Sequence, residues 1–418
     1  MSFQFHLPAA YIVDSLSPPA RDEFLNDLRS VQAEVAAGVV PERSTADKKI
    51  WAKWIEFTSS LHLDGFLQTL ADPVPILQVF AHRVRDGRLA LGGGDVRART
   101  AEAYTRAVGQ TFTGLGQTDP RLNVFGKIDF RLQRQLASWK KEDPAAQRMK
   151  PFPIGFIHCA FKMLRSFETA YHDAIAWMLY VAFFFLMRPG EYCDNGPSSH
   201  PFLMRDVQLH VGAQKLVLAH ESDAMIRAAD FCGLTFTTQK SGVKGEVVGH
   251  SRSGALGACP VRALAEMTLS LRNIGAPDNT PLASYREMPG APIRQLTGKD
   301  FSEALKAAAR VHGGKFGVDP DDVTVGCFRT SGAMALMCGG VDSCRTRLLG
   351  RWQSWTMLRY LHMQARSATR GMSSAMLRGG ALQSSATSAL PDFSPEPPDS
   401  EAMVVPAPTE GYEQPLPG

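Results

Sequence analysis

The stretch Val325–His362, VGCFRTSGAMALMCGGVDSCRTRLLGRWQSWTMLRYLH, decides how the rest of the chain is interpreted. It carries three residues that can bind or attack a phosphate, namely Arg329, Arg351 and Tyr360. Arginine grips phosphate oxygens in a bidentate fork, and a tyrosine hydroxyl becomes a nucleophile where its environment activates it. A fourth candidate, Arg188, lies far upstream in the segment LMRPGEY. We expect these four side chains to meet around one phosphate.

The same stretch predicts short helices separated by glycines. Phe328–Met337 has a helical pattern that Gly339-Gly340 ends, since glycine is the preferred residue just past a helix. Asp342 can cap a second helix, which ends at Gly350. The two helices would therefore be joined by a tight turn.

A third helix is expected after Ser354, and it carries the tyrosine. Trp355, Leu358 and His362 follow three- and four-residue spacing and form its buried stripe. Tyr360 lies roughly 160° from Leu358 at about 100° per residue. This position is typical of an ordinary surface tyrosine or of one that points at a ligand, and taken alone it favours the surface interpretation.

Arg188 stands where a fully apolar segment, Ala174–Met187, stops at Pro189-Gly190. A guanidinium group beside buried residues needs a partner, because an unpaired buried charge is costly. That partner is either Glu191, in a structural ion pair, or a phosphate oxygen. Taken alone, the residue favours the structural ion pair.

Composition indicates a soluble globular chain of two or three domains, with 418 residues, 44% hydrophobic and 21% charged. Seven cysteines without CxxC spacing indicate a reducing intracellular compartment and argue against a disulfide framework and a metal site. The amino terminus does not resemble a secretory leader, and the longest apolar run has 14 residues, too few to span a bilayer. We therefore expect an intracellular protein with no membrane partner.

The net charge of +4 is unevenly distributed. Residues 43–150 carry 18 Lys/Arg against 11 Asp/Glu, and residues 151–372 carry 24 against 18. Residues 1–42 carry two against six, and residues 373–418 one against six. A basic middle suits a polyanion such as double-stranded DNA, with chance clustering of solvated side chains as the alternative. The last block also holds eight prolines and seven serines, which predicts a disordered tail.

Helical periodicity dominates the first two blocks. Residues 18–37 have the pattern of one acidic helix, and residues 43–150 that of a four-helix bundle with basic outer faces. Such a bundle could lie along a duplex, and a bundle with merely soluble surfaces is the alternative. The basic residues that we expect to contact DNA are Lys48, Lys53, Arg97, Arg99, Arg106, Arg131 and Arg134.

Strand signals appear only in residues 151–372. Residues 207–211 alternate in polarity, residues 216–218 return after a glycine turn, and Leu234–Lys240 and residues 246–248 continue the pattern. The strands are not interleaved with helices, so the sheet is expected to be antiparallel. The predicted fold class is mainly α with a small antiparallel β-sheet.

Taken together, the motifs LMRPGE, TTQKSG, GCFR, LLGRW and LRYLH resemble the catalytic domain of tyrosine recombinases, the phage-integrase family. That family carries an arginine in a GLRxxE-like segment, a lysine on a β-hairpin, an HxxR helix, an LGH or GGW turn, and a tyrosine nine residues on. Here Tyr360 lies nine residues after Arg351, and Arg329 lies 22 residues before Arg351. The resemblance implies a helical SAM-like core-binding domain at residues 43–150 and a catalytic domain at residues 151–372.

A closer placement is suggested by two details. The GRW form of the turn and the 52-residue spacing from Arg188 to Lys240 are similar to recombinases of eukaryotic mobile elements, of the DIRS and crypton kind. This resemblance implies a nuclear location if the host is eukaryotic, and a homo-tetramer acting on paired DNA sites.

The family's chemistry implies a site-specific recombinase or integrase that cleaves and rejoins DNA through a 3′-phosphotyrosyl intermediate. Fixed arginines would stabilise the charge that gathers on the phosphate, with neither metal nor cofactor. The lysine would protonate the leaving 5′-oxygen while the tyrosine attacks. The implied catalytic residues are Arg188, Lys240, Arg329, Arg351 and Tyr360.

The resemblance also implies roles for two supporting residues, and this sequence differs from the family pattern at Gly326 and Arg351. Glu191 would orient an arginine from behind, and Trp352 stands next to Arg351, which occupies the position of the family's histidine or tryptophan. The histidine three residues before Arg329 is replaced by Gly326, which removes a proton acceptor typically worth about 10²–10⁴-fold in rate. The alternatives are therefore a catalytically impaired or domesticated DNA-binding protein, or a helical interaction protein that binds acidic partners.

Overall fold

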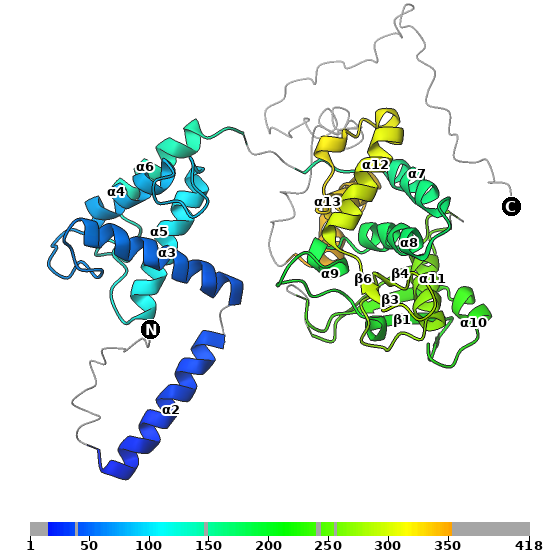
Figure 1. Ribbon diagram of the computed structural model, residues 1–418, viewed down its shortest axis with the longest axis horizontal. Coiled ribbons are helices and arrows are strands. Elements are labelled where there is room, and N and C mark those ends of the chain that lie inside the picture. Colours follow the sequence, from blue (N-terminus) through cyan, green and yellow to red (C-terminus); the bar gives the residue numbers. More distant parts are fainter. Residues whose placement is uncertain (1–15, 38–40, 146–148, 240–243, 255–256, 353–418) are drawn as a thin grey trace, which may run out of the picture. The chain divides into compact units, whose positions relative to one another are not determined.

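The computed structural model describes residues 16–37, 41–145, 149–239, 244–254 and 257–352 (Figure 1). The predicted catalytic residues Lys240 and Tyr360 lie outside these ranges, and so does the predicted tail 373–418.

Helices make up most of the described chain, and a small antiparallel sheet accompanies them, which confirms the predicted fold class. In chain order the longer helices are α2 (Pro18–Ala37), α3 (Pro41–Ser60), α4 (Val74–Arg85), α5 (Ala98–Gly114), α6 (Phe130–Glu142), α7 (Ile154–Arg165), α8 (Ala170–Phe184), α11 (Pro260–Asn273), α12 (Gly298–Phe316), α13 (Cys327–Cys338) and α14 (Ser343–Gly350). Shorter helical segments are α9 (Pro189–Tyr192), α10 (Asp223–Ala228), η1 (Met204–Asp206) and η2 (Pro320–Asp322).

The four helices predicted for residues 43–150 are α3 to α6, and they share an aromatic core. Trp54 is fully buried on α3, with its ring edge-on to Phe80 at 5.1 Å and to Phe112 at 6.2 Å. Its indole N–H donates to the Gly65 carbonyl at 2.8 Å, so the one polar atom of this ring is satisfied. The buried apolar residues of these helices thus form the inner face of the bundle.

The second core is built around α8. Residues 174–183 of this helix are all buried, and α7, α11 and α13 pack against it (Figure 1). The predicted apolar helix ends earlier than expected, at Phe184, because Leu186 adopts a left-handed conformation with φ of 49°. Within the described ranges no helix is long and apolar enough to cross a membrane.

The four-stranded sheet has the antiparallel order β2-β1-β3-β4, and a separate hairpin pairs β5 with β6. The strands are β1 (Val207–Val211), β2 (Gln214–Lys215), β3 (Phe231–Thr235), β4 (Val247–Ser251), β5 (Ser284–Tyr285) and β6 (Arg294–Gln295).

Two strand predictions were wrong in their boundaries. The return strand expected at residues 216–218 lies instead at Gln214–Lys215. The third strand, expected at Leu234–Lys240, runs instead from Phe231 to Thr235. The buried Gln239 side chain accepts hydrogen bonds from the backbone N–H groups of Thr237 at 2.9 Å and Thr238 at 3.2 Å. Because these donors serve a local turn, they are not available to a strand ladder.

Close packing of α13 on α8 depends on Gly332. A Cβ atom added there would lie 2.5 Å from the Phe183 carbonyl oxygen and 2.9 Å from the Leu186 side chain. The backbone oxygen cannot move without disturbing α8, so only glycine fits this contact. The approach matters for function because it fixes the start of α13 beside the end of α8.

We predict that Gly332→Ala lowers the free energy of unfolding by about 1–3 kcal/mol, because the added methyl overpacks the α8–α13 contact. The matched control is Gly314→Ala on the exposed side of α12, where a Cβ would meet nothing within 4 Å. That change should raise stability by up to about 1 kcal/mol, since alanine is the better helix former. Urea unfolding measures both, and equal effects at the two sites would contradict the packing described.

Candidate active site

Arg188 begins the short turn that follows α8. Its guanidinium Nη1 donates to Glu191 Oε1 at 3.0 Å, and its backbone N–H donates to Glu191 Oε2 at 2.9 Å. The Arg188 side chain is 32% exposed, whereas the Glu191 side chain is 5% exposed. The ion pair expected as the structural alternative is therefore present, and part of the arginine still faces solvent.

Arg351 reaches the same carboxylate from the opposite end of the chain. It follows α14 in a left-handed conformation, with φ of 56°, and its Nη2 donates to Glu191 Oε2 at 2.7 Å. Nη1 donates to the Phe185 carbonyl at 3.0 Å, and the side chain is 1% exposed. Burial lowers the pKa of Arg351, and the Glu191 carboxylate opposes that shift. Glu191 therefore neutralises a guanidinium group that water does not reach.

Arg329 enters from the first turn of α13 and is 2% exposed. Its Nη1 donates to the Leu186 carbonyl at 2.7 Å, and its Nη2 donates to the Gly350 carbonyl. The guanidinium carbon lies 4.5 Å from the centroid of the Trp352 ring, within the range of a cation–π contact. Trp352 thus packs on an arginine, although on Arg329 rather than on the neighbouring Arg351.

The end of α8 gathers all of these donors. Arg329 and Arg351 both donate to the Leu186 carbonyl, the latter at 3.4 Å. The His250 Nε2 atom lies 2.9 Å from the Phe184 carbonyl oxygen. The carboxyl end of a helix is electronegative and leaves carbonyls without intrahelical partners, so cations and N–H donors stabilise it. We refer to Arg188, Arg329, Arg351 and Glu191 as the arginine cluster.

The structure therefore brings together three of the five predicted catalytic residues. Arg188, Arg329 and Arg351 share Glu191 or the Leu186 carbonyl, while Lys240 and Tyr360 lie outside the described residues. In this conformation Arg188 has the most exposed side chain of the three. The carbonyls and Glu191 already occupy donors of Arg329 and Arg351, so these two shape the site from the interior.

Gly326 occupies the turn that leads into α13. A Cβ atom there would lie 2.6 Å from the Met149 Sδ atom, which is the far end of a flexible and half-exposed side chain. A larger residue therefore fits only if Met149 moves. Gly326 itself supplies no side-chain acceptor beside Arg329.

The predicted DNA-contacting residues differ in their surroundings. Arg131 is held by Asp72 at 2.5 Å and Asp129 at 3.0 Å, so we leave it out of the DNA-binding surface proposed below. Lys53 pairs with Glu56 at 2.9 Å, and this exposed pair contributes little. The others are exposed on α3, α5 and α6 or at the start of α5: Lys48, Arg97, Arg99, Arg106 and Arg134.

Two neighbouring residues escaped the sequence analysis. His250 is remote in sequence from the end of α8, and nothing in GHSRS distinguishes it from a solvated histidine. Gln239 directly precedes Lys240, but its burial follows only from the tertiary fold. Among the described residues no group of three or more His, Cys, Asp or Glu side chains could hold a metal ion.

Several solved structures align with the chain. One is an integrase of the transposon Tn1549 in complex with transposon right-end DNA, at a TM-score of 0.46 and 14% identity, over 84% of this chain and 99% of that one. Another structure of that integrase, with circular-intermediate DNA, aligns at 0.37 and 12%, over 72% and 84%. The XerA recombinase aligns at 0.34 and 10%, over 80% and 98%.

No protein-family model matches the sequence, and no curated protein matches it. From TM-scores of 0.34–0.46 and identities of 10–14% we draw no conclusion about family or activity.

We predict that Glu191→Gln lowers the free energy of unfolding by about 3–5 kcal/mol, because it leaves the buried Arg351 charge uncompensated. The control is Glu287→Gln, whose partner Arg294 lies 3.8 Å away in an exposed pair. That change should cost under about 0.5 kcal/mol. Urea unfolding followed by tryptophan fluorescence gives both values. A loss below about 1 kcal/mol for Glu191→Gln would contradict its role as the bridging carboxylate.

A pH dependence follows from His250. Burial lowers the pKa of His250, and its contact with the Phe184 carbonyl only partly opposes the shift. The unfolded chain, with a histidine pKa of about 6.5, takes up this proton at a higher pH than the folded chain does. The free energy of unfolding should therefore fall as pH drops below about 6.5.

Burial also lowers the pKa of His158 and His172, so these residues contribute to the same pH dependence. His250→Gln should therefore reduce the slope of the free energy of unfolding against pH without abolishing it. Glutamine does not titrate but keeps an N–H donor for the Phe184 carbonyl. The variant therefore removes the proton uptake of His250 without removing its hydrogen bond. Urea midpoints between about pH 5 and 8 measure the slope. An unchanged slope in the variant would rule out His250 as a contributor.

Proposed function

We propose that this protein is a DNA strand transferase that cleaves and rejoins DNA through a covalent bond between Tyr360 and a 3′-phosphate. The observation that carries the proposal is the arginine cluster. Its three guanidinium groups come from positions 188, 329 and 351, and one buried carboxylate and the end of α8 hold them together. A fixed concentration of positive charge is what a phosphodiester under attack requires.

In this mechanism Arg188 binds a non-bridging phosphate oxygen, because its side chain is the exposed one of the three. Glu191 orients Arg188 and balances the buried Arg351. Arg329 and Arg351 are positioning residues in this conformation, since they fix the turn after α8 from which Arg188 projects. Their positive charge also adds to the field at the phosphate.

The reaction is a transesterification that conserves the number of phosphoester bonds. The Tyr360 oxygen bonds to phosphorus and gives its proton to water, since Gly326 supplies no side-chain acceptor, while the bond from phosphorus to the 5′-oxygen breaks. Lys240 donates a proton to that departing oxygen. The reverse steps, with the 5′-hydroxyl of another strand, rejoin the DNA.

The helical bundle of α3 to α6 is proposed to clamp the duplex. Residues 43–150 carry a net positive charge, with exposed basic side chains on α3, α5 and α6. Neutralising phosphates in this way makes binding sensitive to salt. We further propose a homo-tetramer on paired sites, encoded by a mobile element, and a nuclear location if the host is eukaryotic.

A second candidate function is DNA binding without cleavage. Gly326 offers no acceptor, and the donors of Arg329 and Arg351 are used inside the protein. Both features are expected of a domesticated descendant that retained the fold and lost the chemistry.

We predict that a duplex carrying a nick beside the cleavage site traps a covalent protein–DNA adduct on a denaturing gel. The site would come from selection of bound sequences. Tyr360→Phe should abolish the adduct, because it removes the nucleophilic oxygen. Tyr285→Phe, a tyrosine on β5, is the matched control and should leave the adduct unchanged.

Arg188→Gln tests the cluster in the same assay. Loss of one charged phosphate donor should slow adduct formation by about 10²–10³-fold while salt-sensitive DNA binding persists. Tight binding with no adduct from the unmodified protein would favour the second candidate. An adduct that survives in Tyr360→Phe would exclude Tyr360 as the nucleophile.

A further inference from the structure

The turn between α5 and α6 carries an exposed apolar tip. Val124 is 94% exposed and Phe125 is 82% exposed, and they are the two most exposed large hydrophobic side chains among the described residues. Phe130, the first residue of α6, is 67% exposed. Single exposed apolar residues are ordinary, but neighbouring ones on an ordered turn mark a surface that another molecule covers. We refer to residues 122–128 as the apolar turn.

Hydrogen bonds hold the apolar turn in one conformation. The Asn123 backbone N–H donates to the Lys127 carbonyl at 2.8 Å, and the Gly126 N–H donates to the Asn123 carbonyl at 3.0 Å. The Asn123 side-chain oxygen accepts from the backbone N–H groups of Phe125 at 3.0 Å and Lys127 at 3.1 Å. Gly126 has a φ of 71°, which an L side chain rarely adopts. The tip is therefore ordered before a partner arrives, so binding costs it little conformational freedom.

The base of the turn is anchored to the bundle. Leu122 and Ile128 form an antiparallel bridge, and the Asp129 backbone N–H donates to the Arg121 carbonyl at 2.8 Å. The Arg121 side chain donates to the buried Asp119 carboxylate, from Nε at 3.0 Å and from Nη2 at 2.6 Å. A tip supported in this way keeps its geometry when it contacts a partner.

The surroundings of the turn are basic. Residues 121–141 carry six Lys/Arg against one Asp/Glu. Arg121 and Arg131 are paired with carboxylates. Lys127 in the turn and Arg134 on α6 are exposed, and neither forms an ion pair within the described ranges. The tip therefore combines apolar side chains with positive charge that a polyanion can neutralise.

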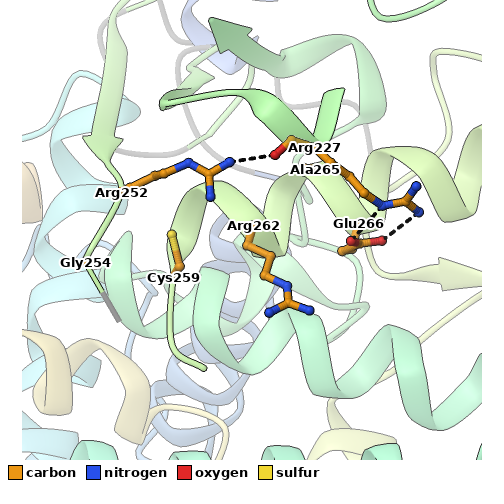
Figure 2. A pocket seen from close by; sticks show the side chains of 7 residues that line it. All are labelled: Arg227, Arg252, Gly254, Cys259, Arg262, Ala265 and Glu266. Carbon is orange, nitrogen blue, oxygen red and sulfur yellow. Dashed lines mark hydrogen bonds and ion pairs between the residues drawn. The ribbon is translucent and has the colours of Figure 1, made fainter. Parts of the chain in front are cut away.

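Two arginines beside α10 are, in contrast, used by the fold itself. In the cavity of about 370 Å³ shown in Figure 2, Arg227 donates to both oxygens of Glu266, at 3.0 and 3.2 Å. Arg252 donates to two backbone carbonyls at the end of α10, at 2.7 and 2.6 Å. The Arg134 guanidinium carbon instead lies 6.0 Å from the centroid of the Phe130 ring. A guanidinium group over an aromatic ring keeps its in-plane N–H groups available to acceptors such as phosphate.

We propose that Phe125 is a wedge that inserts between two base pairs of duplex DNA and kinks the duplex. Proteins that bend DNA insert exposed apolar side chains between base steps, and Lys and Arg side chains bind the adjoining phosphates. Lys127 and Arg134 supply those phosphate contacts here. The inference rests on the DNA binding in the proposed function, but it does not require Tyr360 or strand cleavage.

A second copy of this chain is a less suitable partner for the tip. In a two-fold symmetric contact the same patch meets itself, so the two Lys127 side chains would face each other. Like charges placed opposite each other in an interface oppose association. A base step lacks this conflict, because the phosphates beside it are negative. Charge therefore favours DNA over self-association.

The test places 2-aminopurine, a base whose fluorescence rises when it is unstacked, at successive steps of a duplex selected for binding. The unmodified protein should raise the fluorescence at one step and shorten the duplex, as measured by energy transfer between terminal dyes. Phe125→Ala should abolish the rise and weaken binding by about tenfold, as loss of one base–aromatic contact predicts. Phe125→Leu keeps an apolar wedge and should retain most of the rise.

Two further variants serve as controls. Phe167→Ala removes an aromatic ring that is 54% exposed after α7, and it should change neither measurement. Lys127→Gln should keep the rise in fluorescence but reduce the salt slope of binding by about one, because it removes one phosphate contact. Since the Phe125 side chain is exposed, Phe125→Ala should keep the Tm of the unmodified protein, which separates loss of the wedge from unfolding.

This inference and the proposed function can fail separately. A protein that binds no duplex contradicts the proposed function, and this inference with it. Binding without a rise in fluorescence at any step, or an equal rise with Phe125→Ala, overturns the wedge alone. A lower oligomeric state of Phe125→Ala in the absence of DNA, measured by light scattering, would also overturn it, because a second copy would then cover the tip.

Discussion

The Glu191 carboxylate is the one interaction on which the site depends. It lies in the interior and accepts hydrogen bonds from two arginines that are 163 positions apart in the sequence, Arg188 and Arg351. A buried carboxylate without these partners would be expensive, and so would Arg351 without the carboxylate. Removing any one of the three residues is therefore expected to destabilise the turn after α8. This mutual requirement holds Arg188 at the turn, where its side chain is partly exposed.

The end of α8 explains why buried arginines are tolerated here at all. A helix surrounded by apolar side chains brings its last carbonyls into the interior, where water cannot satisfy them. Arg329, Arg351 and His250 supply the missing donors. The same solution recurs at the end of α10, where Arg252 donates to two carbonyls. In both places an arginine stabilises a helix terminus.

The capping role of these arginines explains how an active enzyme and an inactive DNA-binding descendant could share one fold. Helix capping requires the arginines whether or not chemistry follows, so their retention alone does not identify an enzyme. The properties that separate the two functions are the exposure of Arg188, the acceptor missing at Gly326 and the tyrosine oxygen at position 360. The mechanism proposed therefore rests on a surface residue supported by structural ones, rather than on three equivalent phosphate ligands.

Sequence alone determined the elements whose causes are local. Periodicity predicted α3 to α6, glycine and aspartate placed the ends of α13 and α14, and alternation predicted a small antiparallel sheet. It missed the boundary of β3, because the Gln239 side chain takes the backbone donors that a strand would use. Only the tertiary structure decided that Glu191 serves two arginines, that His250 joins the end of α8 and that Arg131 is occupied by two aspartates. These facts depend on which carbonyls become buried when distant segments pack, and no local pattern records that.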